Sequence, residues 1–179
     1  MSAVHALNRG SAERRQRAIE RLGLHALPAA PVLDGLVRVA ARALRCPVAM
    51  VNMVGADSAW SLASTDGKRL WLPREVAFCS TAIAQPRQLV VNDLRQDARF
   101  ARHPLVDGDP HIRFYAGVPI GDGDETLGTL CVIDTEPRDI DDRRCRRWTT
   151  WLGPLPTGWL PAASTSPWWR PRPVSASAC

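Results

Sequence analysis

The clearest pattern in the chain is a pair of apolar segments separated by a short polar turn. The segments are Arg113–Ile120 and Thr126–Ile133, and the turn contains Asp122-Gly123. An Asp-Gly pair between apolar runs predicts a β-hairpin, because the tight turn needs a positive φ that glycine adopts freely. The second segment is almost continuously apolar, whereas a strand with one solvated face would alternate apolar and polar residues. We therefore expect it to be a central strand with both faces covered.

The remaining pattern predicts further helices and strands. Apolar residues recur every three or four positions in residues 11–24 and 32–45, which indicates two amphipathic helices. Strands are expected over residues 48–54, 59–64 and 89–91, a short buried helix over 76–84, a single helical turn over 97–102 and an irregular segment over 103–110. Antiparallel hairpins with helices gathered on one face of the sheet form an α+β fold.

Several blocks of sequence lie in a fixed order between about Ile19 and Ile140. They read LDGLVRVAARALRCPVAMVNMV, EVAFCSTAI, VVNDLRQDARFARHPLV, HIRFYAGVPI and LGTLCVIDTEPR. In this order they resemble the GAF domain family of bacterial signalling proteins. The resemblance implies an antiparallel β-sheet of five to six strands with helices packed behind it and a ligand cavity in front. It also implies roles in ligand sensing, dimerisation and control of an output domain.

Two ligand classes of the family fit this sequence poorly. Members that bind cyclic nucleotides carry a Lys and a Phe with a downstream Asp-Glu pair, but here no Lys stands beside Asn92 and no Asp-Glu pair follows Phe100. Members that bind bilins attach the pigment through a Cys near a His, and no Cys lies shortly before His111. We therefore expect neither a cyclic nucleotide nor a chromophore, and no cofactor.

The net charge of +5 belongs mainly to the end of the chain. From Arg138 onward there are seven Arg and three Asp, a balance of +4, so the preceding residues carry 16 basic and 15 acidic groups. A balanced body argues against binding to nucleic acid. No apolar run approaches the ~18 residues that cross a bilayer, and the start of the chain lacks the apolar core of a secretory signal. Five scattered cysteines indicate reduced thiols in the cytoplasm.

The last segment departs from the family pattern. A closing amphipathic helix is expected after Asp142, but residues 143–179 hold five of the seven Trp, six of the fifteen Pro and no acidic residue. Proline excludes a helix interior. Our hypothesis is a frameshift near Arg143 that leaves a non-native tail; a natural disordered interaction arm is the alternative. The expected organisation is a helical or flexible segment 1–18, a GAF-like sensory domain 19–142 and a tail 143–179.

Two cysteines raise the possibility of thiol chemistry. Cys79 follows Phe78 in the short apolar helix, and Cys131 lies in the central strand. One branch of the GAF group reduces free methionine sulfoxide with cysteines, which requires accessible thiolates of low pKa and a resolving partner. Free cysteine is among the most buried residue types, so core packing is the favoured interpretation.

A second group of candidates precedes and enters the hairpin. Strand alternation would place His111, Arg113 and Tyr115 on one face, where Arg113 could hold an anionic ligand. The alternative is that Arg113 pairs with Asp93 or Asp97 and anchors the long loop. The four His show no spacing typical of metal ligands. The candidate ligand-binding residues are Phe78, Cys79, Asp93, His111, Arg113 and Tyr115.

The sequence favours a non-enzymatic, cytoplasmic GAF-type module that senses an unknown small molecule. It would act through homodimerisation or a signalling partner, without an output domain of its own, nucleic acid or a membrane. The alternatives are a thiol enzyme of the free methionine sulfoxide reductase type and a truncated remnant of a multidomain sensor. The enzyme requires two of Cys46, Cys79 and Cys131 within disulfide reach and open to a pocket.

Overall fold

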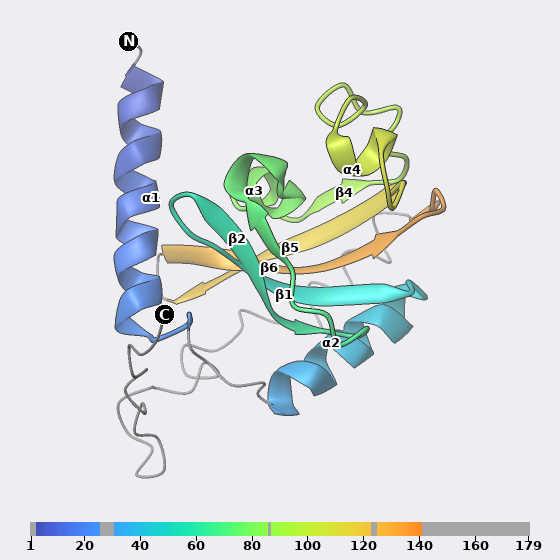
Figure 1. Ribbon diagram of the computed structural model, residues 1–179, viewed down its shortest axis with the longest axis horizontal. Coiled ribbons are helices and arrows are strands. Elements are labelled where there is room, and N and C mark those ends of the chain that lie inside the picture. Colours follow the sequence, from blue (N-terminus) through green and yellow to red (C-terminus); the bar gives the residue numbers. More distant parts are fainter. Residues whose placement is uncertain (1–2, 26–30, 86, 123–124, 141–179) are drawn as a thin grey trace, which may run out of the picture.

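A six-stranded antiparallel sheet forms the centre of the computed structural model, which describes residues 3–25, 31–85, 87–122 and 125–140 (Figure 1). The strand order is β3-β2-β1-β6-β5-β4. The strands are β1 (Val48–Val54), β2 (Ser58–Ser64), β3 (Trp71–Pro73), β4 (Leu89–Val91), β5 (Phe114–Asp122) and β6 (Glu125–Asp134). The helices are α1 (Ala3–Arg21), α2 (Pro31–Leu44), α3 (Phe78–Ala82) and α4 (Pro104–Asp107), with a 3₁₀ turn η1 (Arg74–Val76) before α3.

The predicted hairpin is the pair β5 and β6. Its register runs from Phe114 opposite Asp134 to Asp122 opposite Glu125, and β6 also pairs with β1. The second apolar segment is therefore a central strand, as its pattern predicts. The predicted turn residue Gly123 and the tail 143–179 lie outside the described residues.

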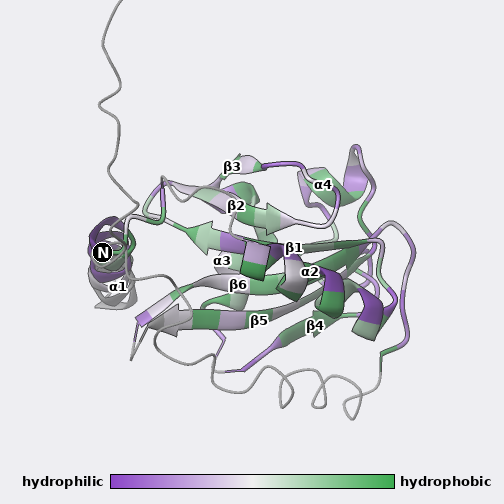
Figure 2. Cartoon of the chain, turned by 90° about the horizontal axis from the view of Figure 1, so that it is seen from below, coloured by the Kyte–Doolittle hydropathy of each residue, from purple (hydrophilic) through white to green (hydrophobic). Residues whose placement is uncertain are grey.

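Helices cover both faces of the sheet, which corrects the expectation that they share one. Val37 of α2 and Ile19 of α1 pack into one apolar cluster with Val51 of β1. Phe78 of α3 packs on the opposite face with Met50, and Figures 1 and 2 show α2 and α3 on opposite sides of the sheet. The reason is that strands such as β1 and β6 are apolar at consecutive positions, so both of their faces need cover. The α+β class and the six-stranded sheet are confirmed.

Local differences from the predicted elements are few. Helix α1 begins at Ala3 rather than residue 11 and ends at Arg21, two residues before Gly23, which has a φ of +64°. There the Leu24 N–H donates to the Ile19 carbonyl and the Gly23 N–H to the Glu20 carbonyl, a Schellman cap. Residues 97–102 form the predicted single turn, in which the N–H groups of Phe100 and Ala101 both donate to the Asp97 carbonyl. Strand β3 and helix α4 are not predicted by the pattern, because each has only three or four residues.

Candidate functional site

An apolar cavity of about 50 Å³ lies between the sheet and the segment that contains α3. One water needs about 10–15 Å³ of the same kind of space, so the cavity has room for a few waters or a small molecule. Its lining comes from all strands except β4, from α3 and α4, and from the connections just before β3, α3 and β5. The lining residues are Met50, Asn52, Ala59, Trp60, Leu70, Leu72, Ala77, Phe78, Cys79, Leu105, Ile112, Tyr115, Cys131 and Ile133.

Aromatic packing fixes the wall made by α3. The Phe78 ring lies 5.5 Å from that of Phe100, edge to face, and 5.6 Å from that of Tyr115. His103 covers its other side at 4.3 Å. The start of α3 is tied to η1, because the Ser80 hydroxyl donates to the Arg74 carbonyl over 2.6 Å. Phe78 is therefore held by contacts from three separate segments.

Among the described residues, three side chains of the cavity wall carry a buried polar atom without a hydrogen-bond partner. They are the Asn52 Oδ1 atom, the Tyr115 hydroxyl and the Trp60 Nε1 atom. The Asn52 Nδ2 atom donates to the Cys131 Sγ atom at 3.4 Å, which orients the amide. Leaving a buried polar group unpaired costs about 1–3 kcal/mol. These three atoms therefore mark places where a bound molecule could form hydrogen bonds.

The cavity wall carries both Cys79 and Cys131, and both thiols are free and buried. Burial raises the pKa of the Cys131 thiol to about 12. The pKa of the Cys79 thiol is also raised, mainly by burial and to a smaller extent by the nearby Cys131. Burial likewise raises the pKa of the Tyr115 hydroxyl well above its usual value. All three groups are therefore neutral at physiological pH.

The structure divides the six candidate residues into two groups. Phe78, Cys79 and Tyr115 meet at the cavity. Asp93, His111 and Arg113 do not line it. Asp93 lies in a polar surface groove beside β4.

The predicted ion pair of Arg113 with Asp93 or Asp97 is wrong, but Arg113 does anchor the long loop. Asp93 pairs with Arg95, which holds the pKa of that carboxyl well below its usual range. Asp97 pairs with Arg99 in the same way. The Arg113 Nη1 atom instead donates to the Val106 carbonyl over 2.6 Å. Arg113 thus anchors the loop through the end of α4.

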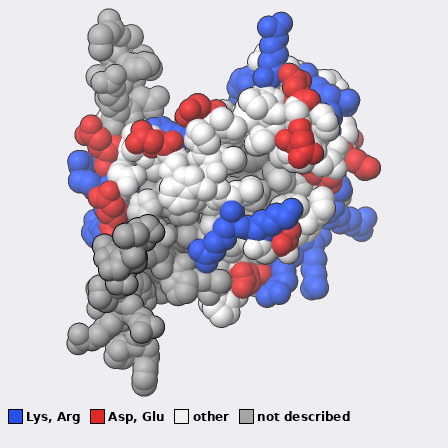
Figure 3. Space-filling view, viewed as in Figure 1, with Lys and Arg blue, Asp and Glu red and all other residues white. Residues whose placement is uncertain are grey.

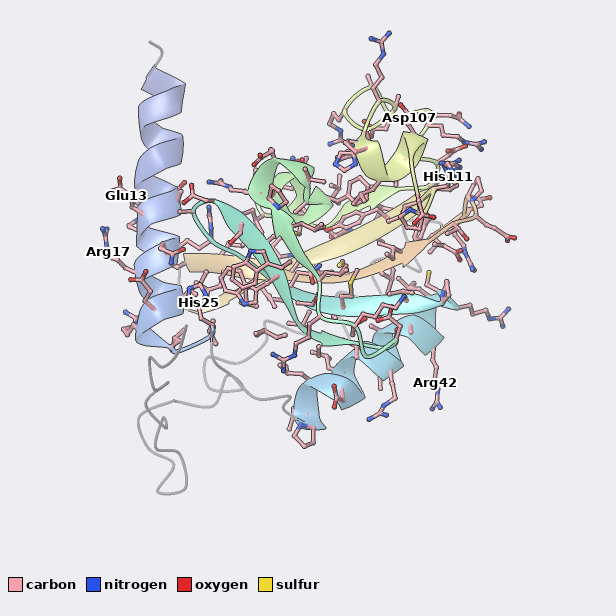
Figure 4. The ribbon with its side chains drawn as sticks, viewed as in Figure 1. Glu13, Arg17, His25, Arg42, Asp107 and His111 are labelled. Carbon is pink, nitrogen blue, oxygen red and sulfur yellow. The ribbon has the colours of Figure 1, made fainter. Side chains whose placement is uncertain are left out.

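His111 precedes β5, and its backbone does not continue the direction of that strand. Its φ is +59°, and its side chain is exposed. Figure 4 places His111 beside Asp107, near α4 and at the end of the sheet remote from α1. Strand alternation applies only within β5, which starts at Phe114, so it does not bring His111 and Tyr115 together.

Asn52 is the cavity residue that the sequence analysis missed. It is the one side chain in the strand segment VAMVNMV with hydrogen-bonding N and O atoms. It lies two positions after Met50, and both line the cavity. An amide in an otherwise apolar strand is the signal that would have found it, because a buried polar side chain requires a partner.

The sequence profile described as "GAF domain" matches residues 28–151. The chain belongs to the GAF domain family. A cyclic di-GMP phosphodiesterase of Pseudomonas aeruginosa is 36% identical over 125 residues, which is 69% of this chain and 21% of that protein. The chain therefore spans about a fifth of this relative's length. The matched GAF segment reaches nine residues beyond the expected boundary at Asp142 (151 − 142).

Solved structures share the fold at low sequence identity. The GAF domain of an Acinetobacter phosphoenolpyruvate-protein phosphotransferase has a TM-score of 0.58 at 15% identity, over 89% of this chain and 94% of that one. The type II free methionine-R-sulfoxide reductase of Thermoplasma acidophilum has a TM-score of 0.55 at 9% identity, over 69% and 86% of the two chains. At these identities the likeness concerns the fold.

Two kinds of site are absent from the described part of the chain. No cluster of three or more His, Cys, Asp or Glu side chains there is arranged to bind a metal ion. Within the same residues, no helix has the length and apolar character needed to cross a bilayer.

Proposed function

We propose that this GAF domain is a sensory module that binds a small molecule in the α3 cavity and transmits occupancy by dimerisation or through a partner protein. The observation that carries the proposal is the cavity itself, in which Asn52 and Tyr115 present buried polar atoms without partners. Pockets of this composition, mostly apolar with a few oriented polar groups, are typical of small-molecule sites.

The phosphodiesterase relative supports a signalling partner. The matched part is about a fifth of that protein's length. The proposed partner is therefore a separate enzyme that turns over a second messenger, and this activity is not assigned to the GAF domain itself. A cyclic dinucleotide is a poor candidate for the cavity, because it is large and anionic while the cavity measures about 50 Å³ and is lined by no Lys or Arg.

Thiol catalysis is the less favoured candidate. Cys79 and Cys131 line one cavity, which is the arrangement that a reductase would need. A nucleophilic cysteine, however, requires a thiolate, and burial raises the pKa of both thiols. The raised pKa supports a non-enzymatic role.

The proposed setting is the cytoplasm, without nucleic acid, a membrane or a cofactor as a partner. Cys79 and Cys131 are free thiols, which fits a reducing compartment. Basic and acidic side chains are interspersed on the face shown in Figure 3, unlike the single basic patch typical of nucleic-acid binding.

Thermal unfolding of the full chain with a panel of metabolites tests the proposal. A compound at about 100 times its dissociation constant raises the free energy of unfolding by ~2.7 kcal/mol, which appears as a higher Tm. The matched control is Asn52→Leu, which keeps the size of the side chain but removes its amide; its own Tm shows that it folds. The proposal fails if no compound raises the Tm, or if every rise persists unchanged in the variant.

A further inference from the structure

The walls of the α3 cavity carry no charge. None of its lining side chains is Asp, Glu, Lys, Arg or His. Its ionisable groups, Cys79, Cys131 and Tyr115, have raised pKa values because they are buried, so they stay neutral. An ionised ligand would lose its hydration there without gaining an opposite charge, which costs far more than burying a neutral polar group.

The unpartnered polar atoms determine which hydrogen-bonding groups a neutral ligand must carry. The Asn52 Oδ1 atom is an acceptor, so it calls for a ligand N–H or O–H. The Tyr115 hydroxyl lies close to the Thr129 hydroxyl and the Cys131 thiol but forms no well-aligned hydrogen bond with a described residue. It can donate to a ligand oxygen or nitrogen acceptor, and the Trp60 Nε1–H group can do the same. Tyr115 is only 1% exposed, so water from the bulk solvent does not satisfy this hydroxyl.

The positions of both groups are fixed before any ligand binds. The amide of Asn52 is oriented by its contact with the Cys131 Sγ atom. The Tyr115 hydroxyl lies over Gly117, where a Cβ atom would overlap it. A site whose polar groups are held in place loses less entropy on binding than one that must order them.

The volume of the cavity further limits which ligands fit. The cavity measures about 50 Å³, against the ~150 Å³ of an engineered cavity that holds benzene. Leu70 lines the cavity and is 38% exposed, so it separates the cavity from solvent. A ligand that fits the existing space has only a few non-hydrogen atoms.

We infer that the cavity selects a small uncharged molecule that carries both a hydrogen-bond donor for Asn52 and an acceptor for Tyr115, as a primary amide does. This inference rests on the proposed function and gives its ligand a chemical class. It excludes carboxylates and phosphates as cavity ligands, and it assigns no ligand-binding role to Arg113 or His111.

Three molecules of nearly equal shape test the ligand class. Acetamide is neutral and has a donor and an acceptor, acetone lacks the donor, and acetate is charged. Each is titrated into the ¹⁵N-labelled full chain at neutral pH while the amide signals of residues 50–52, 77–79 and 115 are followed by NMR. We expect saturable shifts with acetamide. Acetone should bind roughly fivefold more weakly, since one hydrogen bond of about 1 kcal/mol is missing, and acetate should give no saturation.

Variants separate the two polar groups from the rejected candidates. Tyr115→Phe and Asn52→Leu should each weaken the binding of acetamide roughly fivefold, for the same loss of one hydrogen bond. His111→Asn is the matched control, because Asn tolerates a positive φ, and it should bind acetamide as the unaltered chain does. Equal weakening in all three variants would overturn the inference.

The outcomes distinguish the ligand class from the sensory role. Saturable binding of acetate at the cavity signals would overturn the neutral class and leave the sensory proposal standing. Absence of saturation with all three molecules would show a cavity that holds water only, and would also overturn the class. The sensory proposal is judged separately by the metabolite panel, whose compounds include charged ones.

Discussion

Tyr115 depends on the absence of a side chain at Gly117. The two residues are two positions apart on β5 and therefore share a face of the sheet. A Cβ atom at Gly117 would overlap the Tyr115 hydroxyl and come within 2.7 Å of its Cζ atom. The glycine is needed here for close approach, since its φ is not in the left-handed region.

Gly117→Ala should therefore displace the Tyr115 ring. Inserting a methyl group into a packed region typically costs about 1–3 kcal/mol of stability, and urea unfolding measures this. In a Tyr115→Phe background the closest overlapping atom is gone, so the same substitution should cost less. Equal costs in the two backgrounds of this double-mutant cycle would contradict the proposed overlap.

At the scale of elements, His103 connects α4 to the cavity wall. The His103 Nδ1 atom accepts a hydrogen bond from the Leu105 N–H at 3.2 Å, which caps the first turn of α4. The same ring lies on Phe78 of α3. Protonation of Nδ1 would remove the acceptor and so break the cap.

The cap predicts a pH dependence of stability. Burial lowers the pKa of His103, and a hydrogen bond to the Val76 carbonyl opposes this in part. The unfolded chain therefore takes up the proton first as the pH falls below about 6.5, and the free energy of unfolding decreases until the pH passes the folded pKa. Above about pH 6.5, the full contribution of neutral His103 to the free energy of unfolding is present.

His103→Asn should remove this contribution, because Asn can also cap a helix but does not titrate. Unfolding by urea between about pH 7 and pH 5 measures the difference. The loss of stability over that range should be smaller in the variant than in the unaltered chain. An identical pH profile would rule out His103 as the titrating group.

Helix α1 holds the turn between β1 and β2. The Arg15 Nε atom donates to the Val54 carbonyl over 2.8 Å, and the Gln16 Oε1 atom accepts from the Ala56 N–H at 3.1 Å. From the cavity side, the Arg74 Nη1 atom donates to the Ala56 carbonyl at 3.3 Å. The turn therefore lies between α1 and the segment that carries α3.

Arg15→Ala should destabilise the protein by about 1–3 kcal/mol, because the buried Val54 carbonyl loses its donor and the helix loses a packed side chain. Arg17→Ala is the matched control. Arg17 is exposed on the outer side of α1 (Figure 4) and should change stability by less than about 0.5 kcal/mol. Urea unfolding of both variants measures these changes in stability. Similar losses of stability in the two variants would contradict the contact between Arg15 and Val54.

In the described part of the molecule, the sheet separates two large apolar cores, and a third, smaller cluster contains Cys79. One core joins α1 and α2 to the sheet, and the other joins α3 and the loops before β5 to its opposite face. The cavity lies on the α3 side, where the covering elements have only three to five residues. Short covering elements fill the space above the sheet less completely than a long helix, and they leave the cavity between them.

Burial on the α3 side of the sheet predicts unreactive thiols. At about pH 8, Cys79 and Cys131 should react with iodoacetamide much more slowly in the folded chain than in urea, since the thiolate is the reacting species. Mass spectrometry of the labelled peptides measures each site. Native labelling as fast as in urea would show that the thiols are accessible and would favour the reductase alternative.

The sequence by itself determined the elements that follow from local periodicity. Strand β1 and helix α2 agree with their predicted bounds to within one residue, and β6 is central as its apolar run indicates. These features depend on which positions face a core, and the spacing of apolar residues records that directly. The α+β class followed from the same pattern, and the family from the order of its sequence blocks.

The tertiary structure alone decided which residues form the site. Alternation grouped His111 and Arg113 with Tyr115, but the chain turns at His111, and Arg113 meets the carbonyl at the end of α4. Asn52 and Tyr115 lie 63 positions apart (115 − 52) and share the cavity only because β1 and β5 both pair with β6. Strand pairing between distant segments leaves no periodic trace in the sequence, so the cavity and its neutral lining emerge only from the fold.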